Sequence, residues 1–357
     1  MLTSKPDIRS LSVEELIDAF KAKGEPSFRA RQVFEWLWKK NAQSFNEMTN
    51  LSKEIRSWLN NEYSFTVVSV GEMQISKDRT IKCAMTLSDG NVVESVLIPT
   101  ESRMTACISS QVGCSLTCKF CATGKLKRIR NLSAGEIVDQ VFHVRSLSVE
   151  KYGIPLTNIV YMGMGEPLLN YSETIKSIEK ITSPSGMGMS PQRITVSTAG
   201  VAKMIKKMGD DQLKVNLALS LHAANDEKRN KIMPINETNS LDNLAEALNY
   251  FYEKTGTRVT FEYIVFKDFN DELVDAKELV SYCRRVKAKV NIIEYNPIDG
   301  GEFQQTLPER LDAFKNHLET NGIIVNVRRS RGKDIDAACG QLANKNGLAS
   351  SVFKEEK

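Results

Sequence analysis

Residues 11–63 carry apolar side chains at helical spacing. Intervals of three and four residues separate them, which is typical of helices that bury one face. The apolar positions fall into three groups: Leu16, Ile17 and Phe20; Val33, Phe34, Leu37 and Trp38; and Leu51, Ile55, Trp58 and Leu59. Because no strand pattern of comparable length interrupts them, we predict a small helical N-terminal accessory domain over residues 1–64.

The pattern changes to alternation of apolar and polar residues between positions 65 and 104. The alternating segments are 66–70, 80–85 and 92–98, and Asp89-Gly90 separates the last two as a turn. This pattern predicts an antiparallel β-meander that links the helical domain to the rest of the chain. Glu94 lies inside the third segment. It either faces solvent or points into a cleft, where burial would raise its pKa and suit it to act as a base.

From residue 105 onward, strand patterns alternate with helical patterns. A helix is expected over 133–148, where Ser133 and Glu136 have the spacing of a capping box. Repeated strand–helix units predict an α/β domain with a parallel sheet that closes fully or partly into a barrel over residues 105–345. The expected strands are 106–109, 158–162, 193–197, 215–221, 258–265, 290–295 and 323–328. We expect residues 346–357, which end in a charged run, to form a frayed tail.

Composition and cysteine usage narrow the class of protein. Of 357 residues, 41% are hydrophobic and 26% charged, which is ordinary for a globular protein. The N-terminus lacks the apolar core of a signal peptide, and no apolar run approaches the ~18 residues of a membrane span. The seven cysteines are an odd number, which argues against a complete disulfide framework. We therefore expect a cytoplasmic protein with no membrane partner.

The basic residues of the chain occur in short groups, although the net charge is small. The net charge is only +4. Short basic groups recur at Arg29/Arg31/Lys39/Lys40, at Lys125/Lys127/Arg128/Arg130 and at Arg328/Arg329/Arg331/Lys333. Such groups are either solvated faces or contacts to nucleic acid phosphates. The first group lies in the helical domain, which would therefore either bind RNA or serve only as a packing module.

Three cysteines in eight residues carry the strongest chemical signal. Cys114, Cys118 and Cys121 form a C-x3-C-x2-C motif, and thiolates this close together select iron–sulfur clusters, zinc or copper(I). A structural zinc ion needs four ligands, and the nearest candidate, His143, lies 22 residues downstream. Three thiolates on an iron–sulfur cluster would leave one iron open for a further ligand.

Polar residues follow several of the expected strands. Gly165 and Glu166 stand in the GMGEP turn after strand 158–162, where glycines let the backbone approach a ligand and a carboxylate can pair with an ammonium group. The other strand-end residues are Ser197, Ser220, Leu221, His222 and Asn296. Each alone is more typical of a turn, but barrel active sites gather at such strand ends.

Two further cysteines are candidates for chemistry. Cys339 lies among small residues in DIDAACGQL, a setting that favours an accessible thiol in a loop. Cys107 precedes the triple-cysteine motif. For both, a buried structural cysteine is the alternative, and that is the reading we give to Cys83 and Cys283.

The C-x3-C-x2-C motif, GMGEP, the SLH turn and DIDAACGQL together resemble the RlmN/Cfr family of radical S-adenosylmethionine (radical SAM) RNA methyltransferases. The similarity runs over nearly the whole chain. It implies a radical SAM partial (β/α)6 barrel and one [4Fe-4S] cluster on the three motif cysteines. It also implies two molecules of S-adenosylmethionine per turnover. The residues implied to bind S-adenosylmethionine are Gly165, Glu166, Ser197, Ser220, Leu221, His222 and Asn296, with Phe120 near its adenine.

The resemblance also implies a reaction path. Cys339 is methylated first, and a 5′-deoxyadenosyl radical then removes a hydrogen from that methyl group. The resulting radical adds to an adenine carbon of RNA, Glu94 accepts the proton from that carbon, and Cys107 attacks the Cys339 sulfur. Product is released and a transient disulfide remains. Radical addition is needed because the adenine carbons concerned are weak nucleophiles.

Pro167 resembles the RlmN type, which methylates adenine C2, whereas we associate the Cfr type, which methylates C8, with Ala at this position. The RlmN type acts on an adenosine of 23S rRNA and, in some members, on the tRNA adenosine beside the anticodon. We expect an electron donor such as flavodoxin and a monomeric protein. The alternatives left open are a Cfr-type C8 enzyme, a non-catalytic RNA-binding protein stabilised by zinc, and a radical SAM enzyme with a non-RNA substrate.

Overall fold

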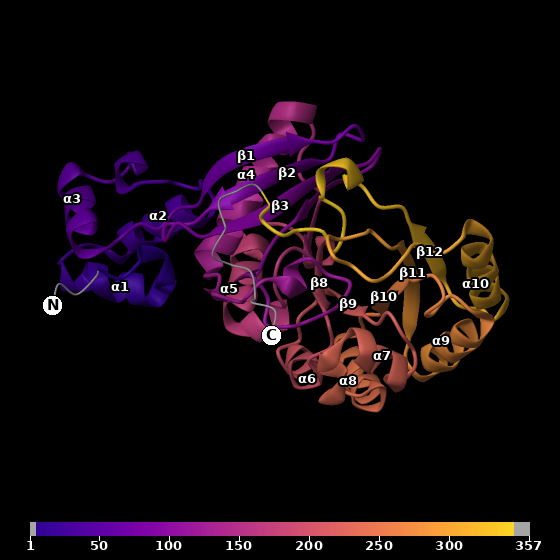
Figure 1. Cartoon of the computed structure of the whole chain (residues 1–357). Coiled ribbons are helices and arrows are strands. Elements are labelled where there is room, and N and C mark those ends of the chain that lie inside the picture. Colours follow the sequence, from indigo (N-terminus) through magenta and orange to yellow (C-terminus); the bar gives the residue numbers. More distant parts are fainter. Residues whose placement is uncertain (1–4, 346–357) are drawn as a thin grey trace.

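The computed structural model describes residues 5–345. At the N-terminal end, helices α1 (Val13–Ala22), α2 (Ser27–Trp38) and α3 (Lys53–Glu62) form a lobe beside the main body (Figure 1). Their apolar faces meet as the helical spacing requires, and the rings of Phe20 and Trp58 pack edge to face with centroids 5.0 Å apart. The predicted helical region is confirmed.

The meander consists of antiparallel strands β1 (Ser69–Ile75), β2 (Ile81–Thr86) and β3 (Val92–Pro99). Its first strand begins three residues later than expected, because the backbone of Val68 is bonded elsewhere. The Val68 N–H donates to the Asp139 carboxylate at 3.0 Å, and the Val68 carbonyl contacts His143 Nε2 at 2.7 Å. Both partners belong to helix α4 (Ala134–Tyr152).

Ten strands of the described chain form one sheet in the order β1-β2-β3-β4-β7-β8-β9-β10-β11-β12. The predicted meander lies between the helical lobe and the barrel, and it also extends the barrel sheet, because β3 pairs antiparallel with β4. All seven expected barrel strands are present and run parallel to one another. They are β4 (Met104–Cys107), β7 (Asn158–Tyr161), β8 (Ile194–Thr198), β9 (Asn216–Ser220), β10 (Val259–Val265), β11 (Ala288–Glu294) and β12 (Val325–Arg328).

Helices follow the barrel strands and cover the outer face of the curved sheet (Figure 1). They are α4, α5 (Tyr171–Thr182), α6 (Ala202–Asp210), α7 (Asp226–Ile232), α8 (Leu241–Thr255), α9 (Leu273–Arg285) and α10 (Pro308–Thr320). Within residues 5–345 this gives the expected six β/α units, and β12 adds a seventh parallel strand. The predicted helix 133–148 is α4, with the Ser133–Glu136 capping box formed at its start. A separate pair, β5 (Gln111–Val112) and β6 (Arg130–Asn131), flanks the triple-cysteine loop.

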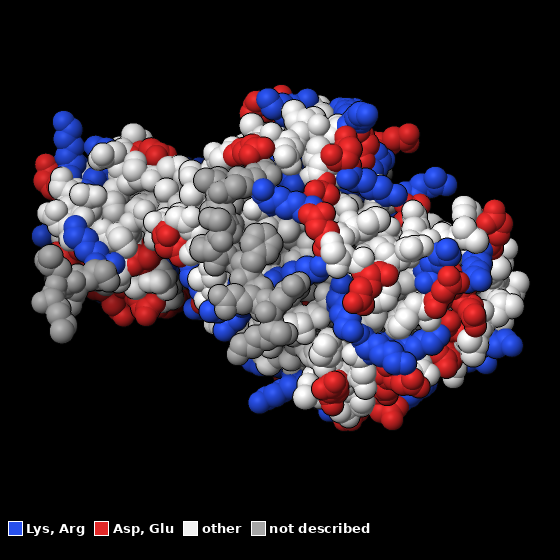
Figure 2. All heavy atoms as spheres, in the orientation of Figure 1, with Lys and Arg blue, Asp and Glu red and all other residues white. Residues whose placement is uncertain are grey.

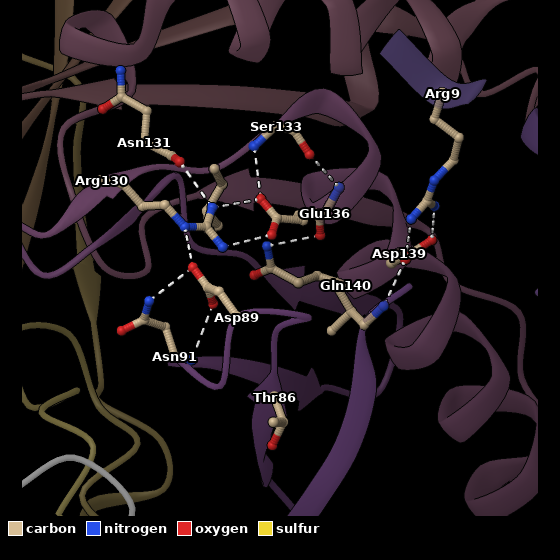
Figure 3. Close-up of polar contacts among 12 residues, drawn as sticks. Arg9, Thr86, Asp89, Asn91, Arg130, Asn131, Ser133, Glu136, Asp139 and Gln140 are labelled. Carbon is tan, nitrogen blue, oxygen red and sulfur yellow. Dashed lines mark hydrogen bonds and ion pairs between the residues drawn. The ribbon is translucent and has the colours of Figure 1, made fainter. Parts of the chain in front are cut away.

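Helix α4 ties three parts of the molecule together through buried polar side chains (Figure 3). Glu136 binds Arg130 from the end of the cysteine loop at 2.8 and 2.9 Å, and Arg130 also binds Asp89 of the β2–β3 turn at 2.6 Å. One turn further, Asp139 binds Arg9 of the N-terminal segment at 2.6 and 2.9 Å. Since buried charges are stable only when they are paired, these contacts fix the lobe and the loop on the barrel.

The predicted domain limits, at residues 64 and 104, stay a prediction. The expected tail, 346–357, lies outside the described residues. None of the helices between residues 5 and 345 combines the length and the apolar character that a membrane crossing requires.

Candidate active site

The three motif cysteines lie on one loop and line one cavity at the carboxyl ends of the strands. The loop is held by its own backbone, because the Cys121 N–H donates to the Cys118 carbonyl at 3.2 Å. The Leu116 N–H donates to the Cys114 sulfur at 3.4 Å. No disulfide joins any cysteine in the described chain. All three cysteines line the same cavity, where a ligand could reach them.

The arrangement of the thiols fits a cluster better than a single ion. Within residues 5–345, no group of three or more His, Cys, Asp or Glu side chains closes around one metal ion. The three cysteines instead stand along the wall of one open cavity. In a [4Fe-4S] cluster each thiolate binds a different iron, so the sulfurs need not converge on one point. A structural zinc site, which needs four converging ligands, has no support among these residues.

Glu166 is buried at the edge of the same cavity. Its carboxylate accepts the N–H of Leu168 at 3.0 Å and that of Ala199 at 2.7 Å. Burial raises the pKa of Glu166, and these two hydrogen bonds act against the rise. Gly165 is required beside it, because the residue has φ +94° and a Cβ there would lie 2.5 Å from Gln111 Cβ. The GMGE turn thus brings a fixed carboxylate against the cavity.

The predicted strand-end residues divide into two groups. Ser197, Ser220 and His222 line the cysteine cavity, but Leu221 and Asn296 do not. Leu221 packs into the hydrophobic core instead. Asn296 lies next to the cavity, where its Nδ2 donates to the Cys339 carbonyl at 3.3 Å. Its Oδ1 is buried and has no hydrogen-bond partner among the described residues, which suits a donor group on a bound ligand.

His222 stands in the left-handed backbone region, with φ 55°. Burial, and then the charge of Arg229, lower the pKa of His222 to about 3, so the imidazole is neutral at pH 7. Its Nδ1 accepts the Ile264 N–H at 3.1 Å. The Phe120 ring packs on it edge to face at 4.6 Å between centroids. These two rings give the cavity an aromatic wall, as expected for a site that holds an adenine.

The loop that carries Cys339 is clamped from two sides. On one side the Ala122 N–H, beside the motif, donates to the Gly340 carbonyl at 2.7 Å. On the other side the Glu94 carboxylate accepts the N–H groups of Ala343 and Asn344 at 2.8 and 3.0 Å. Cys339 therefore stands at a fixed place between the cysteine loop and strand β3.

A second cavity adjoins the first, and it is basic. It is lined by Cys107 and by four arginines from the β3–β4 turn and the end of β12, namely Arg103, Arg328, Arg329 and Arg331. No Asp or Glu is among the described residues that line it. Cys339 lines both cavities and so lies where they meet. On the molecular face that includes this region, basic and acidic side chains are otherwise mixed (Figure 2).

The two thiols of the basic cavity influence each other. Burial raises the pKa of Cys107 to about 12; the nearby Cys339 adds to the rise and Arg328 opposes it. Burial also raises the pKa of Cys339, again against Arg328. The structure thus brings together two cysteines that are 232 positions apart in the chain, as the resemblance implied.

Glu94 is neither on a solvent face nor in either cavity. It is 2% exposed, and its carboxylate lies 3.3 Å from Lys82 Nζ. The expectation of a solvent-facing residue is wrong, and its role as a base stays a prediction. Lys82 could not be recognised from the sequence, because a single lysine within an apolar strand gives no signal of its buried partner.

Arg328 was expected to contact RNA phosphates as one of a basic group. Its guanidinium instead donates to Glu262 at 3.0 Å, at the border of the two cavities. Arg329 and Arg331 are exposed and have no polar partner among the described residues, so they remain candidates for phosphate contacts.

Comparisons with known proteins agree with this architecture. Residues 7–64 match the family described as the ribosomal RNA large subunit methyltransferase N-terminal domain, and residues 108–280 match the radical SAM superfamily. A protein of Cytophaga hutchinsonii named probable dual-specificity RNA methyltransferase RlmN is 60% identical over 341 residues, which are 96% of this chain and 93% of that protein. A dual-specificity RNA methyltransferase RlmN of Nitratiruptor sp. is 42% identical, over 95% of this chain and 98% of its own.

A crystal structure of a radical SAM methyltransferase from Sphaerobacter thermophilus has the same fold. It superposes with a TM-score of 0.89 at 39% identity, covering 94% of this chain and 99% of that one. The expected fold class is thereby confirmed.

Proposed function

The chain belongs to the RlmN family of radical SAM RNA methyltransferases, and from this premise we propose that it adds a methyl group to C2 of adenosine in 23S rRNA and in tRNA. Relatives over the full length of the chain carry the dual-specificity name. Pro167, in the form expected of the RlmN type, supports C2 over C8.

The observation that carries the proposal is the position of Cys339 at the meeting point of two unlike cavities. The cysteine cavity has no Lys or Arg among the described residues that line it. It suits a ligand that bears a sulfonium and an ammonium group. The basic cavity suits a polyanion such as RNA. A thiol between them can receive a methyl group from one side and present it to the other.

On the cofactor side, Cys114, Cys118 and Cys121 would hold one [4Fe-4S] cluster. When bound, the cluster and S-adenosylmethionine supply a 5′-deoxyadenosyl radical. Glu166 would pair with the ammonium group, and the orphan Oδ1 of Asn296 would accept a further hydrogen bond. The other proposed contacts come from Gly165, Ser197, Ser220, Leu221 and His222. Leu221 can contribute only by its backbone, since its side chain is in the core.

On the RNA side, Cys339 would carry the methyl group and Cys107 would resolve the covalent RNA adduct. Burial raises the pKa of both cysteines and so keeps them as thiols at neutral pH. The positive charge of Arg328 lowers the pKa of both and so favours their thiolate forms. Glu94 would accept the proton only if the loop that contains Ala343 and Asn344 moves away. The carboxylate binds that loop in this arrangement.

We further propose two molecules of S-adenosylmethionine per turnover, a one-electron donor such as flavodoxin, a monomer as the active form and a cytoplasmic location. These points follow from the family and from the absence of any contrary feature in residues 5–345.

The test is reconstitution with iron and sulfide without oxygen, followed by reaction with S-adenosylmethionine, a reductant and either 23S rRNA or tRNA. Mass spectrometry of the digested nucleosides should find 2-methyladenosine together with 5′-deoxyadenosine. Finding 8-methyladenosine would assign the Cfr-type activity instead. If a protein with a fully loaded cluster forms neither 2-methyladenosine nor 8-methyladenosine, the assignment of an RNA substrate is contradicted.

A further inference from the structure

Arg229 on α7 is a fully buried cation that no carboxylate of the described chain contacts directly. Its side chain is 0% exposed, and no carboxylate in residues 5–345 lies within 4.0 Å of its guanidinium. Its donors bind neutral oxygens: Nε binds the Leu221 carbonyl at 3.1 Å, and Nη2 binds the carbonyls of Ala199 at 2.6 Å and Ser220 at 3.2 Å. Nη1 binds Asn236 Oδ1 at 2.6 Å.

A second buried arginine shows how unusual this is. Arg9 is also buried, but a carboxylate, that of Asp139, binds both of its terminal nitrogens. The guanidinium of Arg229 binds the side-chain amide of Asn236, whereas that of Arg9 binds the carboxylate of Asp139. The amide is fixed in that orientation, because Asn236 Nδ2 donates to Asp226 at 2.7 Å. Asp226, one hydrogen bond beyond this amide, acts on Arg229 only from a distance. A buried charge with no opposite charge bound to it is costly, so an anion is expected near Arg229 in the loaded protein.

The position of Arg229 identifies that anion by its chemistry. Ala199 and Ser220, whose carbonyls it holds, line the cavity that contains the motif cysteines. The cysteine loop also packs on the helix that carries Arg229, because the Lys119 N–H donates to the Ile232 carbonyl at the end of α7 at 3.0 Å. Burial lowers the pKa of Arg229 to about 10, which still leaves it charged at pH 7. The cation therefore stands behind the wall on which three thiolates would bind a cluster.

We propose that Arg229 is a positioning residue whose fixed positive charge raises the reduction potential of the [4Fe-4S] cluster held by Cys114, Cys118 and Cys121. A cluster with thiolate ligands becomes more negative when it accepts an electron, so a fixed cation stabilises the reduced form more than the oxidised form. The inference rests on the proposed function only in requiring a cluster at these cysteines. It does not depend on which RNA or which adenine carbon is methylated.

The experiment is a redox titration of the reconstituted full chain without RNA, with the reduced cluster followed by electron paramagnetic resonance. In Arg229→Gln, the ratio of reduced to oxidised cluster at a fixed potential should fall about tenfold, which corresponds to about 59 mV for a one-electron couple. Arg229→Lys keeps the charge and should stay within about twofold of the unaltered protein.

A paired exchange tests the charge while Arg229 stays in place. Asn236→Asp combined with Asp226→Asn moves the carboxylate onto the guanidinium and leaves the net charge of the chain unchanged. Like Arg229→Gln, the paired exchange should lower the fraction of reduced cluster at a fixed potential. If Arg229→Gln fails to fold, the paired exchange alone tests the proposal. Arg285→Gln, which removes an exposed arginine paired with Asp242, is the matched control and should have no effect.

Three results would overturn the proposal. They are an unchanged potential in the paired exchange, a fall in Arg229→Lys as large as that in Arg229→Gln, and an equal fall in Arg285→Gln. None of them depends on methylation, so the outcome is separable from that of the nucleoside experiment.

Discussion

The two cavities that meet at Cys339 differ in charge and in origin. The cysteine cavity is lined by Glu166 and Glu262 and by no Lys or Arg of the described chain, whereas the basic cavity is lined by four arginines and by no acid. The first is built from one local motif and the ends of neighbouring strands. The second combines the meander, the last strand and the C-terminal loop. Under the proposed function, this difference in charge would separate the space for a cationic cofactor from the space for an anionic substrate.

The largest expected effect concerns the thiol that joins the two cavities. Cys339→Ala should abolish methylation and form no covalent RNA adduct, because no sulfur remains to carry the methyl group. Cys107→Ala should also stop turnover but should accumulate the adduct, which denaturing gel electrophoresis would detect. Equal amounts of adduct from the two variants would contradict these roles. Iron content and visible absorbance should be unchanged in both, which controls for the cysteine cavity.

The next effect concerns the clamp that holds Cys339 at the junction. Lys82→Met removes one partner of the buried pair with Glu94 and should lower the free energy of unfolding by about 3–5 kcal/mol, measured by urea denaturation. Adding Glu94→Gln to that variant should recover much of the loss, because no buried charge is then left unpaired. Glu35→Gln, which breaks an exposed pair with Lys39, is the control and should change stability by ~0.5 kcal/mol or less. A Lys82→Met variant as stable as the control would show that the pair does not hold the loop.

A smaller effect should separate the basic cavity from its neighbour. Replacing Arg329 and Arg331 together by Ala should weaken RNA binding about tenfold at low salt. It should also lower the slope of log K against log salt by ~0.7–0.9 per lost phosphate contact. Cleavage of S-adenosylmethionine in the absence of RNA should not change, because neither residue lines the cysteine cavity. If both activities fell together, the division of the site by charge would be wrong.

A further effect is a pH dependence of adduct resolution. In the proposed reaction the thiolate form of Cys107 attacks the Cys339 sulfur. An ordinary thiol has a pKa of ~8.5 and is therefore mostly ionised above that pH. Because burial raises the pKa of Cys107 to about 12, the rate of resolution should still rise about tenfold per pH unit between pH 8 and 10. Rapid-quench sampling of the adduct would measure it. A plateau near pH 8.5 would show that Cys107 is less shielded in the complex.

The same pKa has the opposite consequence for the folded state without RNA. The buried thiol stays protonated in the folded protein, whereas the same thiol ionises in the unfolded chain. The free energy of unfolding therefore falls as the pH rises above the pKa of the thiol in the unfolded chain. Cys107→Ser should therefore flatten the decline in unfolding free energy between pH 9 and 11, with Cys283→Ser as a second buried thiol for comparison.

The helices, the strands and the local chemical motifs could be predicted from the amino-acid sequence. The change from helical spacing to alternation and then to strand–helix repeats predicted the three regions, since each period reflects which face of an element is buried. The cysteine motif needed no tertiary information either, because three ligands within eight residues share one loop wherever it lies. Gly165 and Glu166 were found in the same way, as neighbours at the end of a predicted strand.

Only the tertiary structure decided which distant groups meet. Glu94 became the anchor of a loop 249 positions away and the partner of Lys82 on the neighbouring strand. The meander joined the barrel sheet, and Arg328 paired with the buried Glu262. Arg229 showed no feature in the sequence that set it apart from other arginines on helices. Burial and pairing depend on packing between segments far apart in the chain, and periodicity along one segment carries no information about that packing.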